Sequence, residues 1–287
     1  MRGDGRSRLD YRPYKLEVSP LTLTNGSSRI YLPNRSTDVL CSIKADIVPP
    51  LDAGILEINV EVLGGLLHNV SGRGRRRKRL AETDLSQILT SLISNALPLE
   101  QWIIVPNQYC WKLNVDILIL SCSGNVVDVC SMAIYSALQT TYLPSVAILQ
   151  SVDSSTDIMA KAIRKSTDAQ LEIDGDLSKA TLPPGSDQCP IVVTLCRMGK
   201  SHWMVDATND EEACVASKVS VSVDCSGNIC GVQKSGEGGL PFKSMKTLTE
   251  SAGALGKTLL KQLLIPAIET AQSEETKELL SGPFQFH

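Results

Sequence analysis

The first third of the chain is dominated by short runs in which hydrophobic and polar residues alternate. A period of two with many β-branched residues is typical of strands that bury one face of a sheet. The predicted strands span residues 14–18, 29–32, 39–46 and 55–62. The pairs Asn25-Gly26 and Pro49-Pro50 separate these runs, and both are typical of turns.

A helical period follows the strands. Hydrophobic residues spaced i, i+3, i+4, i+7, i+8 and i+11 predict an amphipathic helix that packs on the sheet. These residues are Leu85, Ile88, Leu89, Leu92, Ile93 and Ala96. Pro98 ends the run, because proline cannot continue a helix. Residues 111–120 become continuously apolar, as in a strand buried on both faces, and a second helix is predicted over 128–140.

The second half repeats this order of elements. The predicted hairpins pair residues 190–196 with 202–206, and 215–223 with 229–234. A closing helix is predicted over 243–270, and Pro266 should kink or shorten its end. The tetrapeptide Cys-Ser-Gly-Asn occurs at 122–125 and again at 225–228, each time after a strand. We infer a duplicated β/α unit, and strands grouped ahead of helices favour the α+β fold class.

The predicted organisation is two halves joined by a polar connection. Residues 1–150 form the N-terminal half, residues 151–188 the connecting segment, and residues 189–287 the C-terminal half. The connection contains Pro183-Pro184-Gly185, so we expect it to be partly irregular.

The charge distribution is uneven. The 287 residues carry a formal net charge of −3, yet six cations fall within seven positions, on what we interpret as a loop. They are Arg73, Arg75, Arg76, Arg77, Lys78 and Arg79. One basic patch on an acidic body indicates a local polyanion partner. Three interpretations stay open for these six residues, namely RNA binding, a nuclear import signal, or a solvated loop with neither role.

Other site types find little support. Nine cysteines occur without a CxxC pair, and the three histidines lack metal-ligand spacing to them, so we expect reduced cysteines, no metal and no cofactor. Nothing resembles a leader or a membrane span. Trp102 and Trp111 are expected to anchor the core or an interface rather than stack on bases. His202, in a hairpin strand without a nucleophile at recognisable spacing, is expected to be structural.

Several motifs resemble those of the RNase PH family. The opening Arg2-Gly3-Asp4-Gly5-Arg6 resembles the R-x-D-G-R start of that family, and residues 25–29 resemble its N-G-S-A-R turn. Similar stretches recur across both halves, at residues 37–40, 110–116, 194–196, 205–208 and 211–214. The likeness is to ring subunits of the eukaryotic RNA exosome.

The resemblance implies both a fold and an assembly. The fold is an RNase PH-type unit, similar to domain 2 of ribosomal protein S5, with two pseudo-duplicated β/α halves. The assembly is a hetero-oligomeric ring of six RNase PH-type subunits with cap subunits, around a channel that threads RNA. No membrane partner is expected. Such a subunit acts in 3′-to-5′ processing and degradation of RNA, including rRNA maturation and mRNA turnover, in the nucleus, nucleolus and cytoplasm.

The first departure from the active family concerns phosphate binding. Active members carry G-G-T-R-T-A after the central strand, and its Thr and Arg bind the attacking phosphate. Residues 123–128 read S-G-N-V-V-D here. Val126 takes the place of the arginine, and hydrocarbon cannot replace a bidentate guanidinium at a dianion. Asp128, two residues later, is expected to add repulsion.

The second departure concerns the acidic pair, spaced D-x-x-x-x-x-D in active members. Its first carboxylate can come from Asp210, Glu211 or Glu212, but Ala216, Ser217 and Lys218 lie six residues further on. Asp206 and Glu212 have the spacing, although Asp206 aligns ahead of the pair. The family's substrate-facing S-R-R-E motif is also altered, because Leu80 and Ala81 precede Glu82.

These departures predict a pseudoenzyme without catalytic residues: a ring subunit that scaffolds the assembly and contributes to the RNA path. Two alternatives remain open. One is a phosphate-dependent 3′-to-5′ exoribonuclease, through a composite site with a neighbouring subunit. The other is a free-standing protein that binds RNA through residues 73–79 alone.

Overall fold

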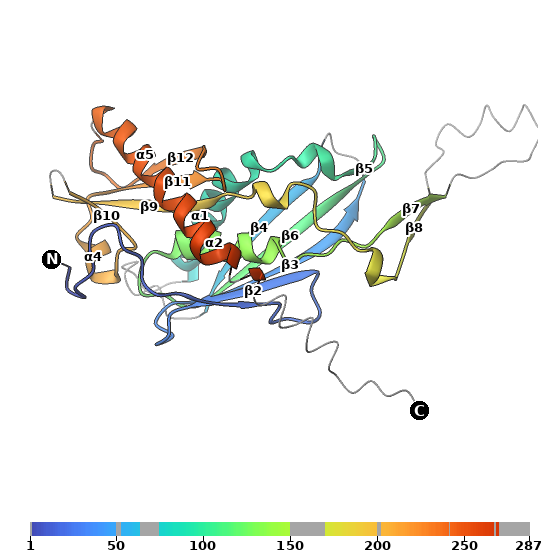
Figure 1. Ribbon diagram of the computed structural model, residues 1–287, viewed down its shortest axis with the longest axis horizontal. Coiled ribbons are helices and arrows are strands. Elements are labelled where there is room, and N and C mark those ends of the chain that lie inside the picture. Colours follow the sequence, from blue (N-terminus) through green and yellow to red (C-terminus); the bar gives the residue numbers. More distant parts are fainter. Residues whose placement is uncertain are drawn as a thin grey trace, which may run out of the picture.

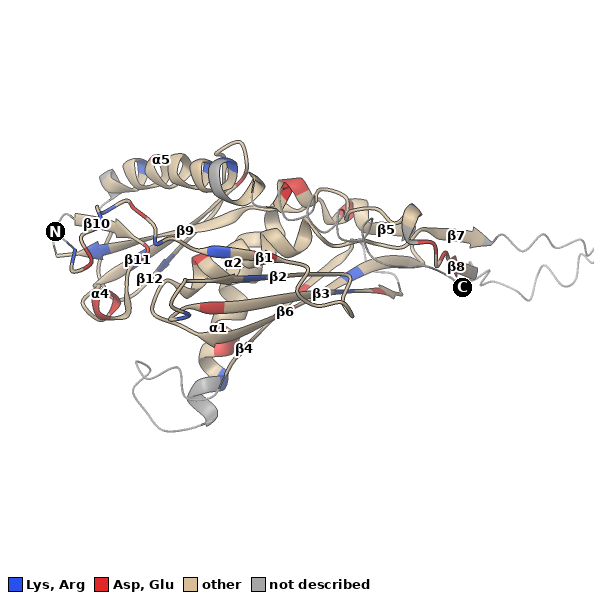
Figure 2. Ribbon diagram, turned by 60° about the horizontal axis from the view of Figure 1, so that its bottom comes forward, with Lys and Arg blue, Asp and Glu red and all other residues tan. Residues whose placement is uncertain are grey.

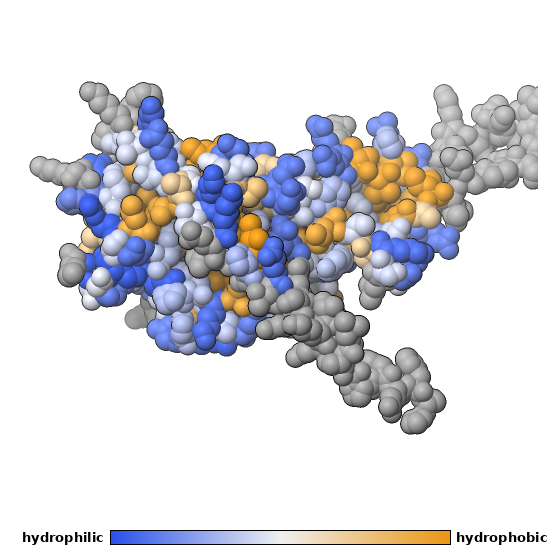
Figure 3. All heavy atoms as spheres, viewed as in Figure 1, coloured by the Kyte–Doolittle hydropathy of each residue, from blue (hydrophilic) through white to orange (hydrophobic). Residues whose placement is uncertain are grey.

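The computed structural model describes residues 2–49, 53–63, 75–149, 170–199, 202–240, 242–266 and 268–269. Figure 1 shows an elongated molecule in which two sheets are packed with helices, and a narrow β-ribbon extends from one end. The ribbon is made by β7 (Val146–Leu149) and β8 (Gln170–Ile173), which pair antiparallel. Ile148 and Ile173 are exposed on it, and Figure 3 shows apolar surface at this end of the molecule.

The N-terminal sheet has the order β1-β2-β3-β6-β4, with β5 beside β6. Its strands are β1 (Lys15–Val18), β2 (Gly26–Tyr31), β3 (Asp38–Val48), β4 (Ile55–Val62), β5 (Ile103–Val105) and β6 (Tyr109–Ser121). Neighbours are antiparallel except for β4 and β6, which are parallel. Parallel neighbours need a crossover, and α1 (Arg75–Ile93) lies on it. The strict alternation of buried and solvent-facing residues along β4 shows that one face of this strand is covered.

The C-terminal sheet is antiparallel, with the order β10-β9-β11-β12. Its strands are β9 (Ile191–Met198), β10 (His202–Val205), β11 (Ser217–Val223) and β12 (Ile229–Ser235). The short helix α4 (Asn209–Ala213) follows β10. It begins with a capping box, in which Thr208 and Glu211 each satisfy a backbone N–H of the other.

Three longer helices pack on the sheets. The helix α2 (Val126–Leu138) is buried almost all round, between β2 and β3 on one side and β9 on the other. The helix α1 packs on β4 and β12, and α5 (Phe242–Leu259) packs on β9 and β11. Short helical turns complete the chain: η1 (Ser94–Ala96), η2 (Leu99–Trp102), η3 (Leu177–Lys179), η4 (Ser186–Gln188) and η5 (Leu260–Leu264). One hydrophobic cluster runs through both halves, so they share a core.

The α+β class is confirmed, and so are the two hairpins of the second half. The division at residues 150 and 188 stays a prediction. Trp102 is a core anchor, because it is buried and donates its indole N–H to the Pro184 carbonyl at 2.9 Å. Trp111 packs, half-buried, against the same core.

One expectation about helix ends is wrong. Residues 75–79 lie in the first turns of α1, not in a loop; the helix extends ten residues ahead of the periodic apolar stripe, over positions that the stripe could not reveal. In the closing helix, the regular α-helical part ends at Leu259, ahead of Pro266, and the helical turns from Leu260 to Pro266 follow it. The preceding turn η5 is a π-helix; such a widened turn is one way to accommodate the N–H that proline lacks.

Candidate active site

The turn at residues 123–125 and the start of α2 border a cavity of about 200 Å³. Its other walls come from α1, α4, β9, β11 and β12. The lining residues are Leu85, Ile88, Asn125, Val126, Val127, Thr194, Glu212, Lys218, Ser220, Gln233 and Ser235. The cavity therefore collects Val126 with one of the three candidate first carboxylates, Glu212, and with Lys218, which lies six residues beyond it.

The turn that precedes α2 has a backbone that only certain residues adopt. Gly124 has a φ of +99°, and a Cβ built on it would lie 2.3 Å from the Ala207 carbonyl oxygen. Asn125 follows in the left-handed region, at a φ of 58°. Glycine and asparagine tolerate such angles best. The turn is thus pressed against residues 207–209, which come from the other half of the chain.

Asp206 is the buried centre of this contact. Its side chain is inaccessible to solvent and accepts hydrogen bonds from Arg6, Arg12, Tyr14 and Asn125 at 2.6–3.0 Å. Burial raises the pKa of Asp206, but the hydrogen bonds and charge of Arg12 outweigh it and hold the pKa below its usual value. The carboxylate is fully engaged in joining the N-terminal segment to the turn, so it has no lone pair to spare for a substrate.

Glu212 holds the same turn from the other side. Its Oε1 accepts the backbone N–H of Asn125 at 3.1 Å and lies 2.9 Å from the Nζ of Lys218. Negative charge is favourable at the start of a helix, and here the protein's own carboxylate supplies it beside α2. Lys218, one of the positions six residues beyond the candidate first carboxylates, is thus the ion-pair partner of Glu212.

Among the described residues that line the cavity there is no unpaired cation. Among its lining residues Lys218 is the only basic one, and it is paired with Glu212. Val126 contributes a hydrocarbon side chain to the lining. The described part of the chain also contains no group of three His, Cys, Asp or Glu side chains placed to hold a metal ion. Among the described residues, the cavity therefore presents one carboxylate and one cation, and the two are paired with each other.

Asp128 does not face the cavity, contrary to the expectation that it repels phosphate there. It is fully buried, and its Oδ2 accepts hydrogen bonds from the Tyr11 hydroxyl at 2.9 Å and the Thr194 backbone N–H at 3.0 Å. Its Oδ1 has no partner. Burial raises the pKa of Asp128 to about 6. The third residue of α2 points inward, so this carboxyl group connects the helix to β9 and the N-terminal segment.

None of residues 79–82, the described part of the basic run and the S-R-R-E region, lines the cavity. Glu82 accepts the backbone N–H of Val62 at 2.9 Å, and Leu80 is exposed. Arg79 is exposed as well. Arg73 and the side chains of Arg75, Arg76, Arg77 and Lys78 lie outside the described residues. The assignment of RNA binding to the run at 73–79 therefore stays a prediction.

The sequence did not reveal that the N-terminal segment binds the residues around the cavity. Arg2 is buried and forms a bidentate ion pair with Glu211 at 2.6 and 2.9 Å, and Arg12 spans from Asp206 to the carbonyls of Ser123 and Gly124. Figure 2 shows this segment lying beside acidic α4. The R-x-D-G-R signature was the available signal, but its partners are nearly 200 residues away in the chain.

Comparison with known proteins places this geometry in a family. Residues 10–144 match domain 1 of the 3′ exoribonuclease family RNase PH, and residues 188–254 match domain 2. A Thermococcus gammatolerans protein named exosome complex component Rrp42 is 30% identical, over 93% of this chain and 90% of its own length. One from Dictyostelium discoideum, provisionally named exosome complex exonuclease RRP42, is 25% identical over 91% and 90%.

The fold has a counterpart among solved structures. A chain of the Archaeoglobus fulgidus exosome with RNA bound to the active site superposes with a TM-score of 0.65 at 22% identity, covering 91% of this chain and 92% of that one. The two family domains account for both sheets, and the cavity lies between them at the start of α2. This chain belongs to the RNase PH family of 3′ exoribonucleases.

Proposed function

We propose that this chain is a non-catalytic ring subunit of an RNA exosome. The Glu212–Lys218 ion pair at the start of α2 carries the proposal. Transfer of the 3′-terminal nucleotide of RNA to inorganic phosphate requires cations that bind the attacking anion. It also requires groups that transfer protons or bind a metal. In this cavity the cation and the carboxylate neutralise one another, and Val126 adds nothing to hold the anion.

The ring role rests on the relatives. Those compared carry exosome subunit names and cover nine-tenths of the chain, and the solved relative is an exosome with RNA bound. The partners we propose are other RNase PH-type subunits, cap subunits and RNA, in a hetero-oligomeric ring. The processes are 3′-to-5′ processing and degradation of RNA, including rRNA maturation and mRNA turnover. The proposed compartments are the nucleus, nucleolus and cytoplasm.

Two measurements test this proposal. The purified chain, given RNA and inorganic phosphate, should release no nucleoside diphosphates, whereas an active RNase PH enzyme in the same assay should release them. Mixed with other RNase PH-type subunits, the chain should elute with them as one complex in size-exclusion chromatography. Release of diphosphates that disappears in Glu212→Gln would overturn the non-catalytic assignment. A chain that stays monomeric among these subunits would overturn the ring assignment.

The basic run at 73–79 is the segment that the sequence predicts as an RNA contact. If all six cations contact phosphates, the slope of log affinity against log salt should be near −4 for single-stranded RNA, at about −0.7 per neutralised phosphate. Replacing Arg75, Arg76, Arg77, Lys78 and Arg79 by glutamine should flatten that slope by about 3.5. An unchanged slope would exclude RNA contact and leave nuclear import as the role of the run.

A further inference from the structure

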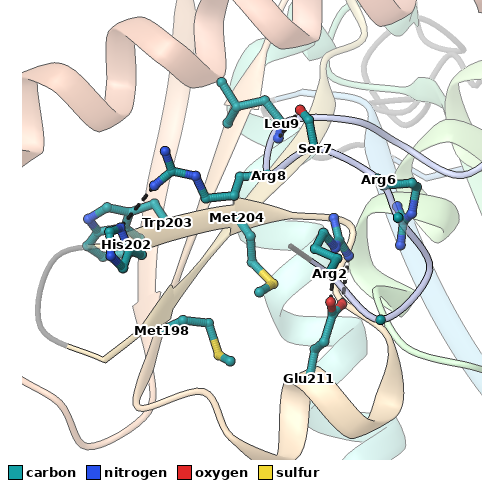
Figure 4. A pocket seen from close by; sticks show the side chains of 12 residues that line it. Arg2, Arg6, Ser7, Arg8, Leu9, Met198, His202, Trp203, Met204 and Glu211 are labelled. Atoms are coloured by element: carbon teal, nitrogen blue, oxygen red, sulfur yellow. Dashed lines mark hydrogen bonds and ion pairs between the residues drawn. The ribbon is translucent and has the colours of Figure 1, made fainter.

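A second cavity, of about 770 Å³, lies between the N-terminal segment and the hairpin of β9 and β10 (Figure 4). It shares no lining residue with the cavity at α2. The lining residues are Arg2, Gly3, Gly5, Arg6, Ser7, Arg8, Leu9, Met198, His202, Trp203, Met204 and Glu211. Cavities of this size typically hold small organic ligands. The arginines that line this one differ in whether a carboxylate of the protein neutralises them.

Two of the three arginines in the wall are neutralised by the protein itself. Arg2 forms its bidentate pair with Glu211 and donates to the backbone carbonyls of Val205 and Asp206 at 2.9 and 2.6 Å. Arg6 donates to the carboxylates of Asp4 and Asp206 at 2.6 and 2.9 Å. Both guanidinium groups are therefore structural, and neither is available to a ligand without breaking a buried contact.

Arg8 is different. Its Nη1 lies 2.9 Å from the Nδ1 of His202, and it has no carboxylate partner within the described part of the chain. A guanidinium only donates, so Nδ1 accepts, and a neutral imidazole then carries its proton on Nε2. Both side chains are exposed. The rim of the cavity therefore presents one uncompensated positive charge and a neighbouring N–H donor, an arrangement that suits an anion with several acceptor oxygens.

The floor below this rim is apolar and polarizable. His202 and Met198 are directly opposite one another across β9 and β10, and Met204 is on the same face of β10. Met204 is buried, and Leu9, on the opposite wall, is 45% exposed. Thioethers make favourable contacts with aromatic rings, and the imidazole of His202 offers a further stacking surface.

We propose that this cavity binds a nucleotide unit, with its phosphate on Arg8 and His202 and its base against Met198 and Met204. Each half of the ligand matches a different part of the wall: the phosphate needs the two donors, and the base needs the thioether floor. The unit can come from a free nucleotide or from a single strand of RNA. The RNA source rests on the proposed function, whereas binding to the cavity itself does not require ring assembly.

The test uses the full chain with Arg75, Arg76, Arg77, Lys78 and Arg79 replaced by glutamine, so that the basic run cannot mask the cavity. A fluorescent oligoadenylate is titrated by anisotropy, and adenosine monophosphate is titrated by calorimetry. Arg8→Gln should weaken whichever ligand binds by roughly tenfold, as expected for a lost charged hydrogen bond. Lys246→Gln removes an equally positive but exposed side chain of α5 and should leave the affinity unchanged.

Two substitutions of His202 distinguish the contribution of its N–H donor from that of its ring. His202→Phe keeps an aromatic ring but removes the N–H donor, and His202→Ala removes both, so affinity should fall in the order wild type, Phe, Ala. Tight binding of the oligonucleotide but not of the monophosphate assigns the site to RNA, and the reverse assigns it to free nucleotide.

Three outcomes would overturn the proposal: no binding of either ligand, equal weakening by Arg8→Gln and Lys246→Gln, or competition by inorganic phosphate as effective as by the nucleotide. The elution test for ring assembly is independent of all three, so failure of this site and failure of the proposed function are distinguishable.

Discussion

At the scale of single residues, two buried aspartates hold the halves together by opposite means. Asp206 is surrounded by arginines and stays ionised, since its pKa is held below the usual 3.8. Asp128 has hydrogen bonds but no ion pair, and burial raises its pKa to about 6. Both were chemistry-bearing candidates in the sequence, and both are structural because their side chains point between elements and not into the cavity.

Asp206→Asn should strongly destabilise the protein. Asparagine tolerates the left-handed backbone of this position, whose φ is 46°, so the loss of charge dominates. Arg6 and Arg12 would lose their buried counter-ion, which costs about 3–5 kcal/mol. Urea denaturation measures this loss.

Asp4→Asn is the matched control, because Asp4 pairs with the same Arg6 at the surface. It should cost less than about 1 kcal/mol. The depressed pKa of Asp206 means that its contribution is present above pH 3.8 and is lost as the pH falls further. The free energies of unfolding of the two variants should therefore become similar in strong acid. Equal destabilisation by the two substitutions at pH 7 would refute the buried role of Asp206.

Asp128→Asn should change how stability depends on pH. The folded protein holds a proton on Asp128 more tightly than the unfolded chain does, because the pKa rises from 3.8 to about 6. Its contribution to stability is greatest below pH 3.8 and declines as the pH rises to 6. Relative to the uncharged variant, the wild type should therefore lose on the order of 1–3 kcal/mol between pH 4 and 7. Parallel stability curves for the two proteins across this range would contradict the assignment.

At the scale of elements, the repeated Cys-Ser-Gly-Asn tetrapeptide marks two turns with different duties. Gly124 and Gly227 both have positive φ, of +99° and +90°. The first is in contact with the backbone of residues 207–209, whereas a Cβ on the second would meet only ordinary contacts at 3.4 Å or more. The likeness in sequence predicted the turns correctly, but only the structure distinguishes a turn that joins the halves from one that ends a hairpin.

Gly124→Ala should therefore be worse than Gly227→Ala. Both variants place a Cβ at positive φ, which costs roughly 1–2 kcal/mol. Gly124→Ala must also displace backbone atoms 2.3–2.9 Å from the new Cβ, and we expect about 2 kcal/mol more from such overpacking. Thermal melting of the two variants gives the comparison. Equal melting temperatures would show that the turn is free to move away from residues 207–209.

Elements with a regular apolar period were predictable, and their ends were not. The apolar stripe from Leu85 to Ala96 indicated α1, because the spacing of its residues is that of one buried face of a helix. Residues 75–79 belong to the same helix without an apolar stripe of their own. For the site, the resemblance to the RNase PH family directed attention to Val126 and to the acidic residues around Glu212, and both Val126 and Glu212 line the cavity. The Glu212–Lys218 pair and the arginines on Asp206 depend on contacts distant in the chain, which no local pattern encodes.

At the scale of the whole molecule, the two halves form one folding unit. Buried side chains of β3 and β6 belong to the same cluster as those of β9 and β11, and α2 is in contact with both sheets. The ion pairs of Arg2, Arg6 and Arg12 all cross from the first half to the second. In the ring that we propose, this rigidity would fix the positions of neighbouring subunits, since they depend on the relative placement of the two sheets.

This shared core predicts that damage in one half spreads to the other. Leu195 on β9 is buried, and Leu195→Ala should cost about 2–5 kcal/mol. In a single cooperative unit, that loss lowers the protection of every amide that exchanges by global unfolding. Hydrogen exchange should therefore accelerate equally in β3 and β6 of the first half and in β9 and β11 of the second. Leu23→Ala, at a position 93% exposed, should leave both unchanged. Faster exchange confined to the second half would mean that the halves unfold separately, and the family's two domains would then be independent units in this chain.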